Sequence, residues 1–296
     1  MTSGFRDLLK REGPIIFDGA MGTSLQQKRV PQDTPLERLN LTHSHMVADV
    51  HSSYGKVGVD VIETNTFGAN RIKLKRYGLG DEVEIINRKG VKIAREVDFP
   101  CLIGASIGPL GVLLKPWGTL DPAQAFSAFK EQIEVVSAEG ADLIVIETMM
   151  SVEEAKIAIQ AAKEVCETPI VCQLTFEKNG KTLMGEDPSS AANIIGDLGI
   201  DALGANCSVG PESLFPVAEK MCAVSRLPLI FQPNAGEPHL KEDKTIYPVG
   251  PGEMANWMER FVNLGVKIVG GCCGSTPAHL RAVVERVKNL KVSPCR

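Results

Sequence analysis

Short apolar segments alternate with longer amphipathic segments along nearly the whole chain. Each apolar segment is four to six residues long and lacks the strict polar–apolar alternation of a half-exposed strand. Such continuous apolar character is typical of strands that are buried on both faces of a parallel sheet. We therefore expect eight strands, at residues 14–18, 60–64, 101–106, 142–147, 170–174, 202–206, 229–232 and 267–270.

Between these strands, apolar residues recur at the three- and four-residue spacing of amphipathic helices. Two segments also carry helix-start signals: Ser151 precedes two glutamates, and Pro277 directly follows Thr276. The expected helices are residues 122–139, 151–166, 191–198, 212–223, 252–264 and 277–288.

Eight strands with helices between them predict an α/β fold of the (β/α)8 TIM barrel type. No low-complexity linker divides the chain, so we expect a single domain over residues 1–296. An open doubly wound sheet is the alternative. Such sheets usually have fewer strands, and no GxGxxG motif follows the first expected strand.

Polar and reactive residues cluster where the expected strands end. In barrels of this kind the carboxyl ends of the strands carry the active site. We therefore expect an active site at this rim, built from residues at the ends of seven of the strands: Asp18-Gly19, Glu63-Thr64-Asn65, Ser106, Glu147-Thr148, Asn206-Cys207-Ser208, Pro233-Asn234 and Cys272-Cys273.

Composition and charge narrow the class of protein. The chain is 44% hydrophobic and 23% charged, which is ordinary for a globular protein. A net charge of −4 without a long basic tract argues against nucleic-acid binding. No run approaches the roughly 18 apolar residues that span a bilayer. Residues 1–13 are charged and unlike a secretory signal, so we expect a cytoplasmic protein.

The eight cysteines need individual explanations, because a disulfide framework is not expected in a reducing compartment. Cys101, Cys166, Cys172 and Cys222 lie in strand or helix patterns and are expected in the core, whereas Cys295 lies in a tail.

The strongest local signal is the adjacent pair Cys272 and Cys273 after the last strand, flanked by glycines. Adjacent cysteines cannot easily bond to each other, but the glycines permit a sharp turn that lets both grip one ion. Cys207, at the end of the sixth strand, lies at a matching level of the barrel. On spacing alone, it is equally possible that the pair is simply buried and that Cys207 is unrelated.

Three thiolates favour zinc and leave one tetrahedral position open, as in catalytic sites. An external thiol bound there would lose its proton and stay nucleophilic, which suits alkyl transfer to sulfur better than activation of water. The histidines offer no competing ligand set and are expected at the surface or at helix caps: His43, His45, His51, His239 and His279.

Four motifs together resemble the homocysteine S-methyltransferase family: FDGAMGT at 17–23, ETNTF at 63–67, GANCS at 204–208 and GGCCG at 270–274. This family includes the homocysteine-binding module of cobalamin-dependent methionine synthase, betaine–homocysteine methyltransferase and enzymes that use S-methylmethionine. The resemblance extends from about Gly13 to Val287, with the motifs in the family's order.

The resemblance implies a (β/α)8 barrel in which Cys207, Cys272 and Cys273 bind zinc. It also implies that the amino and carboxylate groups of L-homocysteine are held by the first-strand loop and by an acid after the fourth strand. An ammonium group needs a carboxylate, and a carboxylate needs backbone N–H groups from a glycine-rich turn. The matching residues are Asp18, Gly19, Ala20 and Glu147.

Each of these positions also has a structural explanation. An acid such as Glu147 is favoured at a helix start, and an aspartate before glycine, as at Asp18, is typical of turns. Asn234 is expected either to orient a ligand or to fill the open zinc position before substrate binds. Glu63, Thr66 and Ser106 are expected to line the pocket, although structural hydrogen bonding explains them equally well.

The expected reaction is in-line methyl transfer to homocysteine, giving methionine. Residues 18–26 and 63–78 look closest to the cobalamin-dependent module, so methylcobalamin, carried by a corrinoid-binding domain or protein, is the expected donor. The chain would then be a fragment of a longer synthase or a stand-alone subunit.

A small onium donor, betaine or S-methylmethionine, ranks second. Betaine needs an aromatic cage, and aromatic residues make up only 5% of the chain. Trp117 is the one candidate, since Trp257 lies in a helical pattern and is expected to pack. A different class is a non-catalytic zinc module that joins the sixth and eighth strands. A zinc hydrolase is remote, because no HExxH or comparable set is present.

Overall fold

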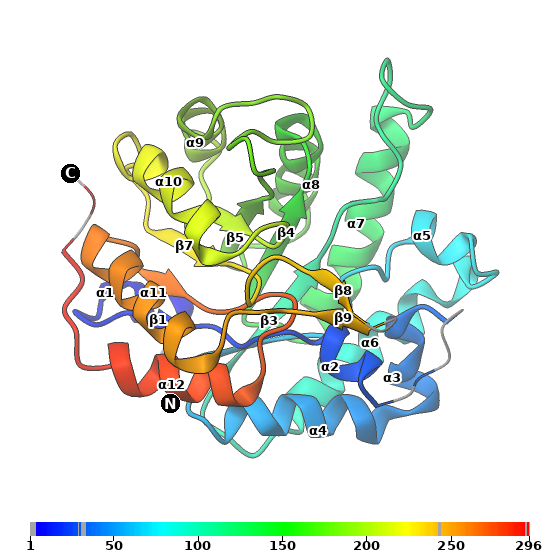
Figure 1. Cartoon of the computed structure of the whole chain (residues 1–296). Helices are drawn as coiled ribbons and strands as arrows, with labels where there is room; N and C mark the ends of the chain where they lie inside the picture. The colour runs from blue at the N-terminus through cyan, green and yellow to red at the C-terminus, as the bar shows by residue number, and fades with distance from the viewer. Residues whose placement is uncertain (1–3, 29, 31–33, 242–243, 294, 296) are drawn as a thin grey trace.

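The computed structural model describes residues 4–28, 30, 34–241, 244–293 and 295. Eight parallel strands pair in the order β1-β10-β7-β6-β5-β4-β3-β2. A parallel bridge between Phe17 and Val61 joins the two ends of this order, so the sheet closes on itself. Helices surround the strands (Figure 1). The predicted (β/α)8 barrel is confirmed.

The barrel strands coincide with the eight predicted segments and are largely buried on both faces, as their apolar sequences require. β5 to β7 have the predicted bounds, β4 runs two residues further, and β1 and β10 are only two residues long. The strands are β1 (Ile15–Ile16), β2 (Val61–Glu63), β3 (Leu102–Ile107), β4 (Leu143–Met149), β5 (Ile170–Leu174), β6 (Ala202–Asn206), β7 (Leu229–Gln232) and β10 (Ile268–Val269).

All six predicted helices are present, and both start signals act as expected. Ser151 accepts a hydrogen bond from the Glu154 backbone, and Thr276 forms a capping box with His279. The helices are α1 (Phe5–Lys10), α2 (Gly22–Gln26), α3 (Leu39–Thr42), α4 (Ser44–Gly55), α5 (Arg71–Lys75), α6 (Val83–Arg95), α7 (Pro122–Ala138), α8 (Val152–Val165), α9 (Pro188–Gly196), α10 (Pro211–Cys222), α11 (Pro251–Leu264) and α12 (Pro277–Val287), with short 3-10 turns at Leu36–Arg38 and Gly80–Glu82.

Helix α9 begins three residues before the predicted start. Asp187 caps it by accepting a hydrogen bond from the Ser189 backbone, and Pro188 occupies the first turn. An aspartate followed by proline is a helix-start signal, and it lies just outside the apolar pattern on which the prediction was based.

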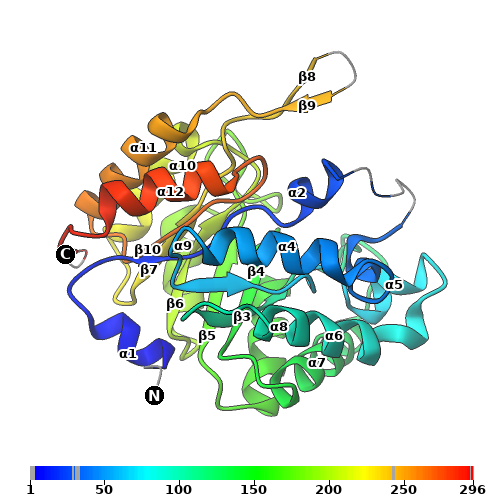
Figure 2. The same cartoon turned by 90° about the horizontal axis from the view of Figure 1, so that it is seen from below.

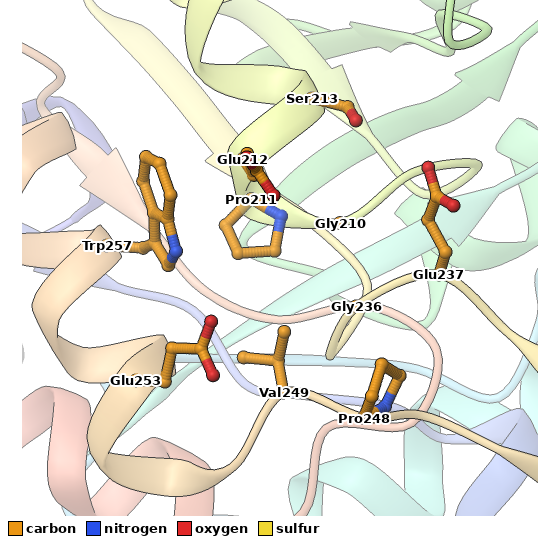
Figure 3. Close-up of a pocket in the computed structure, with 10 residues that line it drawn as sticks. All are labelled: Gly210, Pro211, Glu212, Ser213, Gly236, Glu237, Pro248, Val249, Glu253 and Trp257. Carbon is orange, nitrogen blue, oxygen red and sulfur yellow. The ribbon is translucent and has the colours of Figure 1, made fainter.

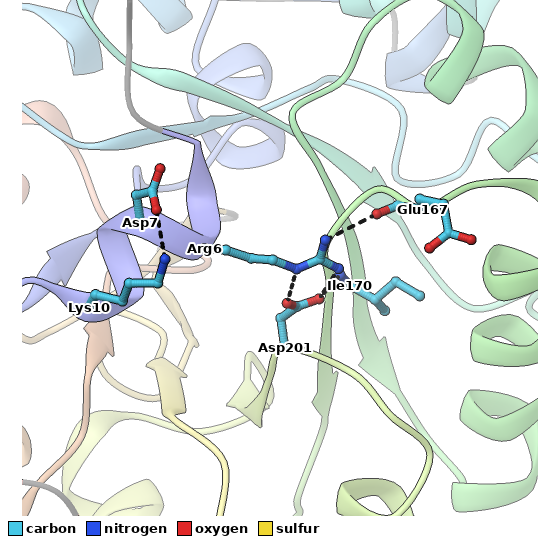
Figure 4. Close-up of polar contacts among 6 residues, drawn as sticks. All are labelled: Arg6, Asp7, Lys10, Glu167, Ile170 and Asp201. Carbon is cyan, nitrogen blue, oxygen red and sulfur yellow. Dashed lines mark hydrogen bonds and ion pairs between the residues drawn. The ribbon is translucent and has the colours of Figure 1, made fainter.

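Helix α1 closes the end of the barrel opposite the rim predicted to carry the active site. Phe5 is 1% exposed and packs edge-on against Phe17, with ring centroids 6.3 Å apart, among inward-facing strand residues. Arg6 forms an ion pair with Asp201 at 2.6 Å and donates to the Glu167 carbonyl (Figure 4). These contacts tie the first helix to the strands it covers.

The connection from β7 to α11 contains an antiparallel hairpin that the sequence did not predict. Its strands are β8 (His239–Lys241) and β9 (Lys244–Ile246). Figure 2 shows this hairpin projecting from one end of the barrel, with α1 at the other end. The hairpin therefore belongs to the same end as the loops that follow the barrel strands.

Two expectations about single residues were wrong. Cys222 is buried as expected, but it forms a disulfide with Cys295. The tail folds back against the start of the chain, where the Val292 backbone donates to the Glu12 carbonyl, and so brings Cys295 into reach. His51 is fully buried on α4 rather than exposed, and burial lowers its pKa to about 3.

None of the helices in the described part of the chain combines the length and the apolar character that crossing a bilayer requires.

Candidate functional site

Three cysteines from distant parts of the sequence meet at the carboxyl end of the strands. The sulfur atoms of Cys207, Cys272 and Cys273 all lie within 4.8 Å of one another, and those of Cys207 and Cys273 are 3.8 Å apart. Two sulfurs bound to a tetrahedral zinc at about 2.3 Å would be separated by about 3.8 Å. All three residues are partly exposed. The donor set and its spacing therefore fit a zinc ion with one side open.

The backbone around the cysteines is held in an uncommon conformation. Cys207 and Ser208 have φ values of 59° and 60°, in the left-handed region that residues other than glycine rarely adopt. The Cys207 backbone donates to the Gln232 carbonyl, and the Cys272 backbone donates to the Pro233 carbonyl. Conformations of this kind cost about 1–3 kcal/mol each and cluster at functional sites.

The thiol cluster concentrates negative charge on one sulfur. Hydrogen bonds from Cys207 and then from Cys272 lower the pKa of Cys273 to about 3, while hydrogen bonds with Cys207 and Cys273 raise the pKa of Cys272 well above its usual range. A thiolate held next to two further thiols is a favourable site for a soft cation.

A second cluster consists of three carboxyl groups, on Asp18, Glu63 and Glu147. Asp18 is buried, and the two glutamates are partly exposed. Asp18 accepts a hydrogen bond from the Glu63 backbone at 3.1 Å, so the carboxyl groups of these two residues are neighbours. The Glu147 carboxyl accepts from Ser106 and, at 2.8 Å, from Asn206.

Burial and repulsion between like charges both raise the pKa values of Asp18 and Glu63. Burial raises the pKa of Asp18 and of Glu63 well above the usual range, and the charge of Glu147 raises both further. Burial also raises the pKa of Glu147. One oxygen of Asp18 and one of Glu63 have no hydrogen-bond partner in the structure. A bound ammonium group would supply both the missing donors and the missing positive charge.

The loop after β1 fits only part of its expected role, which is to bind the amino and carboxylate groups of the substrate. Gly19 lies against Ser275, Leu280 and Tyr54, where a Cβ atom would come within 2.8 Å of each, so a side chain is excluded. The Ala20 N–H already donates to the Ser275 hydroxyl at 3.1 Å. Binding of a substrate carboxylate through Ala20 would have to displace this bond.

The remaining expected site residues differ in role. Asn234 is 3% exposed, and its side-chain oxygen has no hydrogen-bond partner in the structure, which leaves it available to a ligand. The Thr66 hydroxyl bonds to the Ser106 carbonyl and to the Thr64 hydroxyl. For Thr66, this geometry favours the structural explanation.

Two glutamines that carry no motif in the sequence link β5 and β7 to the carboxyl cluster. Gln173 donates to Gln232 at 2.7 Å, and Gln232 donates to Glu63 at 2.8 Å. The side-chain oxygens of Gln173 and Thr175 have no partner in the structure. The sequence signal that could have identified these glutamines is a polar residue inside an otherwise apolar strand. A buried polar side chain requires a hydrogen-bond partner.

A cavity of about 280 Å3 lies outside the site, between α10 and α11. Gly210 and Gly236, which line it, follow the segments that carry Cys207 and Asn234. Figure 3 shows Trp257 and Glu253 on one side of the cavity and Glu237 on the other. Trp257 also packs against Phe215, with centroids 5.9 Å apart, as predicted for a packing residue.

Comparison with known proteins identifies the family. The model of the family described as homocysteine S-methyltransferase matches residues 15–287. The chain belongs to this family. Within the homocysteine S-methyltransferase family it is similar to the methionine synthase of Mycobacterium tuberculosis (strain ATCC 25618 / H37Rv), with 32% identity over 296 residues, covering 94% of this chain and 25% of the relative. The methionine synthase of Mycobacterium leprae (strain TN) is 31% identical over 292 residues, covering 92% and 24%.

The chain thus spans about a quarter of the length of these curated relatives. Among solved structures, the metallated form of the homocysteine methyltransferase MmuM from Escherichia coli superposes with a TM-score of 0.80 at 20% identity, covering 95% of this chain and 99% of that one. Its oxidized form gives a TM-score of 0.79 at 20% identity and covers 94% and 97%. These likenesses show a shared fold.

Proposed function

We propose that this barrel binds zinc and L-homocysteine and transfers a methyl group to the homocysteine thiol, giving methionine. The observation that carries the proposal is the position of the Cys207–Cys272–Cys273 cluster beside the cluster of three carboxyl groups. Asn206, next to Cys207, donates to Glu147, and the backbone of Gly271, next to Cys272, donates to the Asp18 carbonyl. One cluster fits a soft metal that binds a thiol, and the other fits an ammonium group. Homocysteine carries both groups in one small molecule.

The metal would be held by the three cysteine sulfurs, with the open side of the cluster left for the substrate thiol. When bound, zinc supplies the positive charge that keeps a coordinated thiol deprotonated at neutral pH. Asn234, with its free side-chain oxygen, would face this open side before the substrate arrives.

The carboxyl cluster would orient the substrate. The unpartnered oxygens of Asp18 and Glu63 would accept hydrogen bonds from the ammonium group, and Glu147, on β4, would contribute further negative charge. The backbone at Gly19 would meet the substrate carboxylate. Fixing both ends of the substrate leaves its sulfur in a single position for in-line attack.

In the transfer step, the homocysteine sulfur forms a bond to the methyl carbon as the bond from that carbon to the donor breaks. The electron pair of the broken bond leaves with the donor, and the thiol proton has already been released to solvent on binding. No general base is required at the methyl group, so the chain mainly supplies deprotonation and alignment.

The proposed donor is methylcobalamin on a corrinoid-binding domain or protein, and the chain is then one homocysteine-binding barrel domain over residues 1–296. Two observations support this donor. The relatives of about four times the length are named methionine synthases. In addition, loops that follow barrel strands expose large apolar side chains, which suit contact with another protein: Leu113, Trp117, Leu183 and Leu240.

A small onium donor remains the second candidate, because the family that the four motifs resemble includes enzymes that use betaine or S-methylmethionine. Against a betaine cage, the Trp117 side chain is 75% exposed and therefore faces solvent. A purely structural zinc module gives no explanation for the unpartnered carboxyl oxygens of Asp18 and Glu63 beside the metal site.

The deciding experiment gives the purified, zinc-loaded protein homocysteine with free methylcobalamin, betaine or S-methylmethionine in parallel and measures methionine. X-ray absorption at the zinc edge should show an oxygen or nitrogen neighbour replaced by sulfur when homocysteine is added. Replacement of any cluster cysteine by serine should abolish zinc retention, whereas Cys166→Ser, at the end of α8, serves as the matched control. A full zinc equivalent in Cys207→Ser would contradict the proposal.

A further inference from the structure

Tyr54, on α4, is fully buried, and neither the sequence motifs nor the proposed mechanism uses it. A buried phenol hydroxyl needs a polar partner. The Tyr54 hydroxyl donates to two backbone carbonyls, those of Ala20 and Ser275, each at 3.1 Å, and shares its one hydrogen between them. Ala20 belongs to the loop after β1, and Ser275 lies just after the cysteine pair. One hydroxyl group thus joins the two loops that carry the proposed substrate and metal sites.

The same two loops share further hydrogen bonds. The Ala20 N–H donates to the Ser275 hydroxyl at 3.1 Å, and this hydroxyl donates to the Cys272 carbonyl at 2.7 Å. The Gly271 N–H donates to the Asp18 carbonyl at 3.0 Å. We call these bonds, together with those of the phenol hydroxyl, the loop brace. The loop brace fixes the loop after β1 at a set distance from the loop that holds the cysteine pair.

The distance between the two loops sets the length of substrate that reaches both sites. In the proposed function the metal binds the thiol, whereas Asp18 and the Gly19 backbone bind the amino-acid end. Cysteine carries the same three groups as homocysteine but is one methylene shorter. At a fixed distance between the loops, cysteine therefore satisfies only one end of the site at a time. Loops that move freely toward each other would hold the shorter molecule at both ends.

We propose that Tyr54 determines specificity: by holding the loop after β1 against the cysteine loop, it makes the site select homocysteine over cysteine. This inference rests on the proposed function, since it assumes that both ends of the substrate are bound. Tyr54 is a positioning residue, because its hydroxyl bonds to the loops and not to the substrate. The packing at Gly19 is close, since a Cβ atom there would lie 2.8 Å from the Tyr54 hydroxyl and 2.7 Å from the Ser275 hydroxyl. The loop after β1 therefore rests directly on the loop brace.

The test compares the binding of L-homocysteine and L-cysteine to the zinc-loaded protein by calorimetry. The selectivity ratio is the Kd of cysteine divided by the Kd of homocysteine. Tyr54→Phe keeps the buried ring and removes only the hydroxyl. We expect the selectivity ratio to fall about tenfold in this variant, since a well-fitted site discriminates by about 10- to 200-fold for one methylene. Ser275→Ala removes other bonds of the loop brace, so it should lower the ratio as well, and it decides the test if Tyr54→Phe does not fold.

The matched control is Val50→Ala, which truncates a buried side chain one turn earlier in α4 and removes no bond of the loop brace. Its selectivity ratio should equal that of the unmodified protein. Zinc content is measured first in every variant. An unchanged ratio in folded Tyr54→Phe would overturn the inference, because a merely structural hydroxyl would weaken the binding of both thiols alike. An equal fall of the ratio in Val50→Ala would also overturn it. Failure of the proposed function looks different: the unmodified protein itself would retain no zinc and bind neither thiol.

Discussion

The carboxyl cluster should reduce the stability of the protein, and Glu63→Gln tests this directly. Glutamine has nearly the shape of glutamate. Its oxygen can still accept the hydrogen bond from Gln232, and its amide group can donate to the Asp18 carboxylate, which the glutamate can do only while protonated. The substitution replaces a like-charged contact with a charge-assisted hydrogen bond.

The size of the stability change in Glu63→Gln and its pH dependence follow from this replacement of a like-charged contact by a hydrogen bond. A hydrogen bond to a charged group contributes roughly 1.5–3 kcal/mol, so we expect about 2 kcal/mol of added stability at pH 8. Because the pKa of Glu63 is raised in the folded protein, chiefly by burial, its favourable contribution exists at low pH. That contribution is lost as the pH rises above the unfolded pKa of about 4.5 and through the folded value. Glutamine does not titrate, so the advantage of the variant should grow between pH 5 and pH 8.

The assay is denaturant unfolding of the zinc-saturated proteins at both pH values, with Glu84→Gln as a control at a side chain that is 70% exposed. Calorimetry should show homocysteine binding weakened by roughly 10- to 100-fold in Glu63→Gln, because the ammonium loses a charged acceptor. A variant that is no more stable than the parent at pH 8, or whose advantage is the same at pH 5, would refute the reasoning.

Three further substitutions test the closed end of the barrel, a close contact between two strands and the proposed docking loop. Phe5→Ala empties the closed end of the barrel and should cost about 3–5 kcal/mol in denaturant unfolding, with zinc content per folded molecule unchanged. Gly204→Ala places a Cβ atom 1.7 Å from the Ile230 carbonyl oxygen and should lower the melting temperature far more than Gly196→Ala, whose Cβ meets only a side chain at 3.5 Å. Trp117→Ala should slow methyl transfer from a corrinoid protein but leave transfer from free methylcobalamin unchanged; equal slowing with both donors would show that Trp117 does not serve docking.

The sequence predicted what depends on apolar pattern and on distinctive residues. The barrel strands could be located because they are apolar on both faces, and Cys207 could be paired with residues 272 and 273 because a closed barrel brings strand ends together. The β8–β9 hairpin could not be found in this way, because it is short and polar and its sequence carries no strong strand signal. The glutamine chain through Gln173 was missed because a polar residue in a strand does not reveal its partner. The partner of Cys295 depends on how the tail folds back, which no local pattern encodes.

The closed end of the barrel contributes mainly to stability, whereas the mouth carries the proposed functional site. At the mouth, Cys207 has a left-handed backbone, and Asp18, Glu63 and Asn234 bury polar atoms without partners. Each of these features opposes folding unless a ligand is bound. At the other end, the Phe5 ring packs in a cluster of buried apolar side chains that come from all eight barrel strands. Because the strands run continuously between the two ends, packing at the closed end can hold the mouth in an arrangement that its own contacts would not maintain. Homocysteine and zinc should therefore stabilise the protein by more than their contacts with isolated groups suggest, since they supply the charges and donors that the mouth lacks.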